Sequence, residues 1–368
     1  MSGLERDSFD KPVDIETYGI KYAGSKQKLI PYILNEVFKF KPTTVIDAFS
    51  GTTRVSQALA KSGIKCVSND ISEWSQVFAR AFLLPRDENE VKEVITHLNT
   101  VQPYCGWFTE HYGGELSEHK KVWQNKNAKK LDAIRDEIDK LDLSDITKSV
   151  ALASLLLALD KVDSTLGHFT SYLKDWSARS HKDLRLDVPE YMGENLDHVV
   201  TKLDVLSDEF GDLNADLAYM DPPYGSNNEQ MPSSRIRYAS YYHLWTTIIK
   251  HDKPEIFGAA GRREDSRDAL AVTEFEEFRK NNKDRFIAID AIEKSIKNVD
   301  AEYVLLSYSS GGRATAADLT ELLEGIGRIC NIASIDHKRH IMASMSWTKD
   351  WISDSQEGHK EYLFTLQK

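Results

Sequence analysis

The chain has 368 residues, of which 41% are hydrophobic and 29% charged, as expected of a globular protein with one large domain or one domain and an insertion. Its net charge of -11 counts against a nucleic-acid partner, and Cys66, Cys105 and Cys330 form neither a disulfide framework nor a zinc knuckle. The N-terminus lacks an apolar signal core and the longest apolar run, 150–159, is too short to span a bilayer, so we expect a cytoplasmic protein without a membrane partner.

The segment that ends at Pro85 predicts a parallel α/β unit. Gly63 ends its first helix and Pro85 stops its second. Alternation of strands and helices with short connections favours a parallel sheet with right-handed crossovers. The predicted elements are a strand at 45–49, a helix at 54–61, a strand at 64–68 and a helix at 72–84.

The character of the sequence changes after Pro85. Residues 86–195 hold helical stretches at 128–141 and 146–159 between aromatic-rich loops, which predicts an inserted, mostly helical subdomain. The sheet resumes afterwards, with a long and partly irregular excursion at 225–270. The later predicted elements are strands at 199–203, 215–220 and 303–307, a helix at 316–323, and a closing hairpin of 329–335 with 362–366.

The most informative stretch is Asp221-Pro222-Pro223-Tyr224, which directly follows a buried strand. Two prolines cannot extend a strand, because each lacks a donor and fixes φ. The chain therefore presents a carboxylate, a rigid elbow and an aromatic ring at a carboxyl strand end, where open α/β sheets bind ligands. A carboxylate that accepts from an exocyclic amine, beside a stacking ring, can hold a nucleobase by its amino group.

A second candidate site is the run Asp-Ala-Phe-Ser-Gly-Thr-Thr at 47–53, a strand that leads into a glycine turn and a helix. Gly51 lets the backbone approach a ligand closely, and the helix N-terminus favours negative charge. Asp70 ends the next strand, where an acid can accept from a pair of ribose hydroxyls. An ordinary α/β turn with an exposed aspartate is the alternative interpretation of this run.

A third candidate is Lys21-Tyr22-Ala23-Gly24-Ser25-Lys26, which precedes the first helix. A flexible glycine between two lysines and an aromatic ring can grip the carboxylate of an amino-acid ligand. Taken alone, a solvated basic turn is the simpler interpretation.

These segments resemble the Dam-like, alpha-class DNA adenine-N6 methyltransferases of restriction–modification systems. The run from Lys21 resembles the family's Lys-Trp-x-Gly-Gly-Lys, and the run from Phe49 its Phe-x-Gly-x-Gly, with Thr53 in place of the second glycine. The order of the motifs around an insertion is also that of the family. The resemblance implies an α/β, Rossmann-like class I methyltransferase fold with a mostly parallel seven-stranded sheet and an inserted, mainly helical target-recognition subdomain.

The resemblance also implies S-adenosyl-L-methionine as cofactor and an acid that contacts its adenine amino group. Asp204 is our candidate for that acid, with Asp197 and Asp208 as competitors. The cofactor-binding candidates are Tyr22, Gly24, Lys26, Asp47, Phe49, Gly51, Thr52, Asp70 and Asp204.

Three residues are predicted to act on the target adenine, which is flipped out of the duplex. Asp221 and the Pro222 carbonyl accept hydrogen bonds from N6, and Tyr224 stacks on the base. Methyl transfer is then direct, and no metal is required. His337 and His340 have helical spacing but no third ligand, so we favour a solvated basic patch there.

The predicted division of the chain follows from these motifs. Residues 1–85 and 196–368 are the two halves of the catalytic domain, for the cofactor and the target adenine respectively, and residues 86–195 are the target-recognition subdomain. The expected partners are double-stranded DNA and possibly a cognate restriction endonuclease. Residues 222–263 carry six Lys and Arg against three acids, which places a local basic excess directly after Pro222-Pro223-Tyr224.

Two kinds of alternative stay open at this point. A related enzyme could methylate RNA adenine or cytosine N4, although the acidic Asp221 favours adenine in DNA. A catalytically silent DNA-binding module on the same fold is the other alternative, and the intact run from Asp221 to Tyr224 speaks against it.

Overall fold

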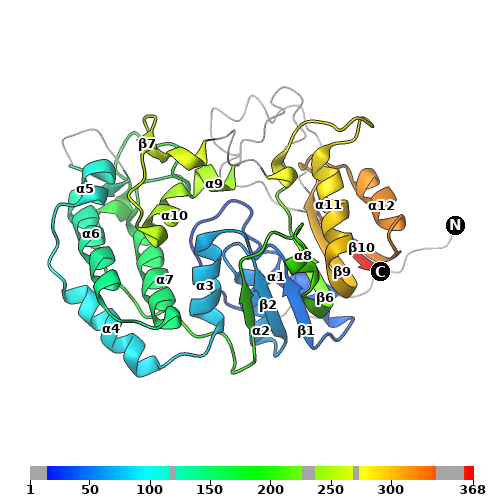
Figure 1. Ribbon diagram of the computed structural model, residues 1–368, viewed down its shortest axis with the longest axis horizontal. Helices are drawn as coiled ribbons and strands as arrows, with labels where there is room; N and C mark the ends of the chain where they lie inside the picture. The colour runs from blue at the N-terminus through cyan, green and yellow to red at the C-terminus, as the bar shows by residue number, and fades with distance from the viewer. Residues whose placement is uncertain (1–14, 116–121, 226–236, 268–272, 337–359) are drawn as a thin grey trace.

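The computed structural model describes residues 15–115, 122–225, 237–267, 273–336 and 360–368 (Figure 1). The segment His337–His340 lies outside these residues. At the centre of the described chain is a seven-stranded sheet in the order β10-β11-β9-β6-β1-β2-β5. Its strands are β1 (Thr44–Asp47), β2 (Lys65–Asn69), β5 (Val199–Thr201), β6 (Asn214–Met220), β9 (Asp300–Ser309), β10 (Arg328–Asp336) and β11 (Lys360–Gln367).

The sheet is mostly parallel, as predicted. Neighbouring strands from β5 to β9 pair in parallel, whereas β11 runs antiparallel between β9 and β10. The predicted closing hairpin is therefore confirmed as the pair β10–β11. This sheet has the Rossmann-like arrangement that the resemblance implies.

Apolar side chains of the central strands alternate between two faces, which gives the sheet a helical layer on each side. One face packs against α1 (Ile30–Phe38) and α2 (Arg54–Lys61). The other packs against α11 (Ile287–Asn298) and α12 (Ala316–Glu324). The residues of β1 and β6 that alternate are Val45, Leu217 and Tyr219 toward the first layer and Ile46, Ala218 and Met220 toward the second.

A group of helices extends from one end of the sheet, on the left in Figure 1. Within it, α7 is buried along most of its surface, as expected of a helix that is apolar on every side. The helices of this group are α4 (Glu88–Thr100), α5 (Trp107–Tyr112), α6 (Asn125–Lys140) and α7 (Asp145–Val162), with α10 (His243–Lys250) beside them.

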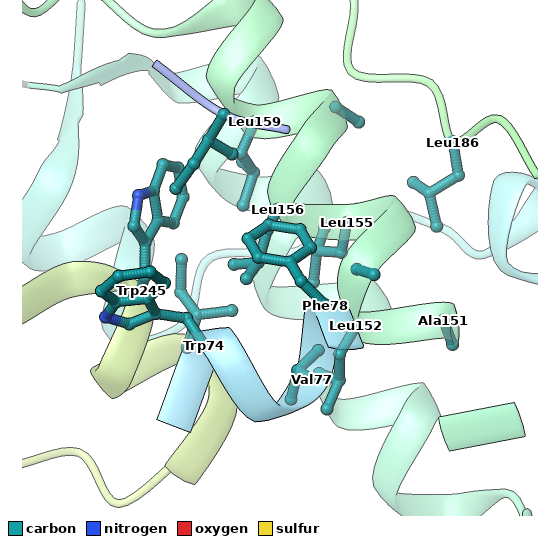
Figure 2. Close-up of a cluster of buried hydrophobic side chains, with 14 of the residues drawn as sticks. Trp74, Val77, Phe78, Ala151, Leu152, Leu155, Leu156, Leu159, Leu186 and Trp245 are labelled. Carbon is teal, nitrogen blue, oxygen red and sulfur yellow. The ribbon is translucent and has the colours of Figure 1, made fainter. Parts of the chain in front are cut away.

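The helical group shares one hydrophobic core with α3 (Glu73–Leu83), which covers the sheet edge. Figure 2 shows Trp74 and Phe78 of α3 against Leu155, Leu156 and Leu159 of α7, with Trp245 of α10 beside them. The core thus continues across residue 86, where we placed the start of the insertion. The residue limits of the three predicted segments remain a prediction.

The predicted helices and strands are present, with ends that differ by a few residues. One predicted strand, 199–203, ends earlier, at Thr201, because Leu203 bonds instead to the Asn69 side chain, with distances of 2.9 Å at its N–H and 3.0 Å at its carbonyl. Helices α4, α5, α10 and α11 were not predicted individually. The remaining short elements are β3 (Gly113–Gly114), β4 (Trp123–Gln124), α8 (Asp208–Gly211), α9 (Tyr238–Tyr241), β7 (Ile256–Phe257) and β8 (Arg262–Arg263).

Candidate active site

A cavity of about 620 Å³ opens at the carboxyl ends of β1, β2 and β6. Strand β1 has β2 on one side and β6 on the other, so the cavity lies at the point where the strand order reverses, the usual ligand site of such sheets. All twelve predicted site residues line it, although they come from five separate parts of the chain. They are Tyr22, Gly24, Lys26, Asp47, Phe49, Gly51, Thr52, Asp70, Asp204, Asp221, Pro222 and Tyr224.

The turn between β1 and α2 forms one wall of the cavity. Gly51 has a φ of 49°, in the left-handed region, and its N–H donates to Asp70 Oδ2 at 2.9 Å. Thr53 is also left-handed, with a φ of 62°, and so takes the conformation that glycine would take in the family pattern. Its Oγ1 accepts from Gln57 Nε2 at 3.0 Å, and its N–H donates to the Ser50 carbonyl at 2.6 Å. Hydrogen bonds therefore hold the turn without a second glycine.

Two acids lie beside this wall, the buried Asp47 and the half-buried Asp70. Asp47 Oδ2 accepts from Ser56 Oγ at 2.6 Å, whereas Asp47 Oδ1 has no hydrogen-bond partner in the described structure. Burial raises the pKa of Asp47 to about 7, and burial also raises the pKa of Asp70. The cavity thus offers an unused acceptor and an acidic lining, which suit a ligand with hydrogen-bond donors and positive charge.

Aromatic rings form another part of the cavity lining, and the Tyr22 ring among them lies next to Gly51. The ring centroid of Tyr22 lies 5.3 Å from that of Trp74, 5.3 Å from that of Tyr238 and 4.8 Å from that of Tyr242. The Tyr242 hydroxyl accepts from the Ala23 N–H at 2.7 Å, which fixes the turn that carries Tyr22. Because Trp74 belongs to α3 and Tyr242 precedes α10, the helical group holds this part of the cavity lining in place.

Lys21 and Lys26, the two lysines of the third candidate run, do not form the predicted binding site for a ligand carboxylate. Lys21 Nζ pairs with Asp160 at 3.0 Å and with Asp163 at 3.2 Å. Lys26 Nζ pairs with Asp221 at 3.1 Å and with Glu361 at 2.5 Å. Both ammonium groups therefore already have carboxylate partners within the protein. Lys26 lines the cavity as predicted, but its ammonium group is bound to the motif that begins at Asp221.

Asp221 and Tyr224 lie side by side at the end of β6. The Tyr224 hydroxyl contacts Asp221 Oδ1 and the Lys26 ammonium, and it donates to Glu361 Oε1 at 2.8 Å. Burial raises the pKa of Asp221 to about 6, with Lys26 acting to lower it and Glu361 to raise it. The site thus presents a half-buried carboxylate that is ionised near neutral pH, next to a fixed aromatic ring.

Strand β9, which pairs with β6, supports this motif. The Tyr308 ring meets the Tyr224 ring edge-on, with centroids 4.9 Å apart, and its hydroxyl donates to the Tyr224 carbonyl at 3.1 Å. Ser307 Oγ donates to Glu361 Oε1 at 2.8 Å.

Asp204 lies at the cavity, whereas its competitors Asp197 and Asp208 do not line it. The bonds between Leu203 and the Asn69 side chain position this segment after β5. Asp204 is exposed, and its Oδ1 accepts from the Leu206 N–H at 2.9 Å. Its contact with a cofactor stays a prediction.

Three lining or supporting residues were missed by the sequence analysis: Glu361, Tyr238 and Phe275. Phe275 meets the Phe49 ring edge-on at 5.2 Å. The sequence does contain an indication of Glu361. In a strand, alternate residues point to the same face, and Glu361 alternates with Leu363 and Thr365, which are both fully buried. An acid at an inward position of an apolar strand indicates a buried ion pair.

Two searches of the described residues gave no site of another kind. No group of three or more His, Cys, Asp or Glu is arranged to hold a metal ion there. None of the helices in that part of the chain combines the length and apolar character needed to cross a membrane.

The sheet and the cavity at its reversal point are those of a Rossmann-like α/β protein that binds a ligand at the carboxyl ends of its strands. The chain belongs to the family of D12 class N6 adenine-specific DNA methyltransferases, whose family model matches residues 22–305. It is therefore a DNA methyltransferase specific for adenine, and the family implies dependence on S-adenosylmethionine. This result decides against RNA adenine and cytosine N4, the alternatives left open by the motif.

Named relatives agree with this family. Type II methyltransferase M.NlaIII from Neisseria lactamica is 24% identical over 95% of this chain and 99% of its own length. Type II methyltransferase M.CviAII from Paramecium bursaria Chlorella virus 1 is 25% identical over 94% of this chain and 97% of its own. Modification methylase StsI from Streptococcus sanguinis is 25% identical over 90% of this chain, which spans 50% of that longer protein.

Proposed function

We propose that the cavity binds S-adenosylmethionine against the Gly51 turn and the target adenine against Asp221 and Tyr224. The main observation behind this proposal is the half-buried Asp221 carboxylate, which lies beside the Tyr224 ring in one cavity with the Gly51 turn and Asp70. An acceptor for an amine and a platform for a flat base thus share a cavity with the features of a nucleoside site.

The acidic lining supports this cofactor. S-adenosylmethionine carries a sulfonium and an ammonium group against one carboxylate, and when bound it supplies a methyl group on positively charged sulfur. Asp47 Oδ1 is a buried acceptor without a protein partner, and Asp70 stands beside the glycine turn. Asp47, Asp70 and Asp204 would hold its donor groups, and Phe49 and Tyr22 would pack against its apolar parts.

Asp221 and the Pro222 carbonyl would each accept one hydrogen of the adenine amine, which fixes the direction of the nitrogen lone pair. Tyr224 would stack on the flipped base and offset about 1–3 kcal/mol of the unstacking cost. Positioning and charge stabilisation account for the rate in this scheme, and no covalent enzyme intermediate is formed.

The proposal extends to the biological setting. The relatives are named type II methyltransferases and modification methylases, which supports a site-specific enzyme that protects DNA from a cognate restriction endonuclease. Residues 86–195, together with parts of 225–270, would recognise the DNA sequence. The enzyme would act in the cytoplasm of a host cell, where the DNA is.

The test is the substitution Asp221→Ala. Methyl transfer from tritiated S-adenosylmethionine to unmethylated genomic DNA should fall by about 10²–10³-fold or more, because the amine loses its charged acceptor. Cofactor affinity, measured by calorimetry, should stay within a few-fold, since Lys26 keeps Glu361 as partner and no buried charge is left unpaired.

Asp212→Ala is the matched control, because Asp212 is exposed just before β6 and should retain activity. Robust methylation by Asp221→Ala would remove Asp221 from the mechanism. DNA binding by the wild type without label in DNA, RNA or protein would instead support the silent module.

A further inference from the structure

One buried ammonium group at the active site, that of Lys26, pairs with two carboxylates, the buried Glu361 and the half-buried Asp221. Lys26 is 8% exposed and Glu361 is 4% exposed, so this pair is shielded from water. The distance from Lys26 Nζ to Glu361 is 2.5 Å, against 3.1 Å to Asp221. With one positive and two negative charges, the group carries a net charge of about -1 when all three are ionised.

Glu361 is the more fully bonded of the two carboxylates. Its Oε1 accepts from Lys26 Nζ, from the Tyr224 hydroxyl at 2.8 Å and from Ser307 Oγ at 2.8 Å. Three donors satisfy an ionised carboxylate even where water is excluded. Asp221 is farther from the Lys26 ammonium than Glu361 is. Asp221 lines the cavity, whereas Glu361, on β11, is not part of the cavity lining.

We propose that Glu361 is a positioning residue for methyl transfer: by holding the Lys26 ammonium, it keeps the Asp221 carboxylate available to accept from the target amine. The inference rests on the proposed function of Asp221. Without Glu361, Lys26 would turn wholly to Asp221 and compete with the substrate for its oxygens.

The charges around Asp221 make the loss of either partner measurable as a change in the pKa of Asp221. Burial raises the pKa of Asp221 to about 6, and of its two charged neighbours Lys26 lowers that pKa while Glu361 raises it. Loss of Glu361 should therefore lower the pKa of Asp221, and loss of Lys26 should raise it. The other titratable groups that face Asp221 are Tyr22, Asp47, Tyr219, Tyr224 and Tyr238.

The experiment compares Glu361→Gln with wild type in the pH profile of kcat. We expect the acid limb to move down by about one pH unit, kcat to fall about tenfold or more, and KM for DNA to change little. Glu361→Asp keeps the charge and should restore the position of the acid limb. Glu302→Gln on β9 is the control, because Glu302 is exposed, and it should match wild type.

A second readout does not need turnover. In protein labelled with ¹³C at the aspartate carboxyls, the resonance that disappears in Asp221→Asn identifies Asp221. Its titration midpoint should fall in Glu361→Gln and rise in Lys26→Gln, and in the double variant it should lie between the two. Lys28→Gln is the control for the lysine, since Lys28 is exposed.

The inference would be overturned if Glu361→Gln changed neither the acid limb of the kcat profile nor the titration midpoint of Asp221. Glu361 would then have a purely structural role. If that variant does not fold, Lys26→Gln carries the test, and a midpoint that does not rise overturns the inference. Failure of the proposed function is a distinct result, because Asp221→Ala would then remain active whatever Glu361 does.

Discussion

Tyr224 contributes two parts to the site, a ring and a hydroxyl, and the two parts have different sets of contacts. The ring lies against Tyr308, with the Lys26 ammonium 4.7 Å from its centroid, and it lines the cavity, where we propose that the adenine stacks. The hydroxyl contacts Lys26, Asp221 and Glu361. The hydroxyl can therefore be removed while the ring is kept.

Tyr224→Ala should weaken capture of the flipped base by about 1–3 kcal/mol, because the stacking surface is lost. The measurement is the fluorescence of DNA with 2-aminopurine at the target position, which should rise less than with wild type. Tyr224→Phe keeps the ring and should retain the signal. An unchanged signal in Tyr224→Ala would contradict stacking.

Local sequence could identify residues of the cavity that belong to motifs, because each motif stands at a strand end. Asp221, Gly51 and Asp70 were predicted in this way, and the structure brings them to one cavity. The partner of Lys26 could not be predicted, since Glu361 is 335 positions away and its place follows from the pairing of β11 with β9.

At the scale of elements, α3 links the sheet to the helical group. One side of α3 covers the sheet edge, and its apolar side chains Trp74 and Phe78 also pack against α7 (Figure 2). Strand and helix periodicity predicted α3 and α7 separately. It could not predict their contact, because an amphipathic pattern shows which face of a helix is buried but not against which element.

Leu155→Ala should cost about 2–5 kcal/mol, because it leaves a cavity where α7 meets α3. Since the two helices share a core, unfolding in denaturant followed by tryptophan fluorescence and by circular dichroism should remain one transition, shifted to lower denaturant. Leu157→Ala, at a half-buried position of the same helix, should cost less. Two separate transitions would show that the helical group unfolds independently of the sheet.

At the scale of the whole molecule, a negatively charged protein acts on a negatively charged polymer. The net charge is -11, and part of it is concentrated in the cavity, where Asp47, Asp70, Asp204 and Asp221 meet. Acids gathered around a cationic cofactor need not oppose DNA binding elsewhere on the surface, because screening in salt limits the reach of exposed charges to about 10 Å.

The buried Asp47 should make the stability of the protein depend on pH in an unusual direction. The pKa of Asp47 is raised to about 7, well above its usual value, so between about pH 4 and 7 the folded protein holds a proton that the unfolded chain has released. The contribution of Asp47 to the free energy of unfolding is therefore present at low pH and is lost as the pH rises to 7.

Asp47→Asn should remove this loss. The free energies of unfolding of the variant and of wild type are measured in urea without cofactor. The difference, variant minus wild type, should increase by a few kcal/mol between pH 4 and pH 8. Asp216→Asn is the control, since hydrogen bonds from Thr43 and Thr44 lower the pKa of Asp216 and its contribution is constant above about pH 5. A difference between Asp47→Asn and wild type that does not vary with pH would contradict the shift.

The core shared by α3 and α7 bears on any attempt to give this enzyme a new target sequence by exchanging residues 86–195 with those of a relative. Such a graft would bring a foreign α7 against the native Trp74, Val77 and Phe78, which also help to hold the tyrosines of the cavity. A mismatch there would disturb methyl-donor binding as well as target choice. Hybrids that carry α3 along with the exchanged segment should therefore keep their activity more often than those that divide the chain at Pro85.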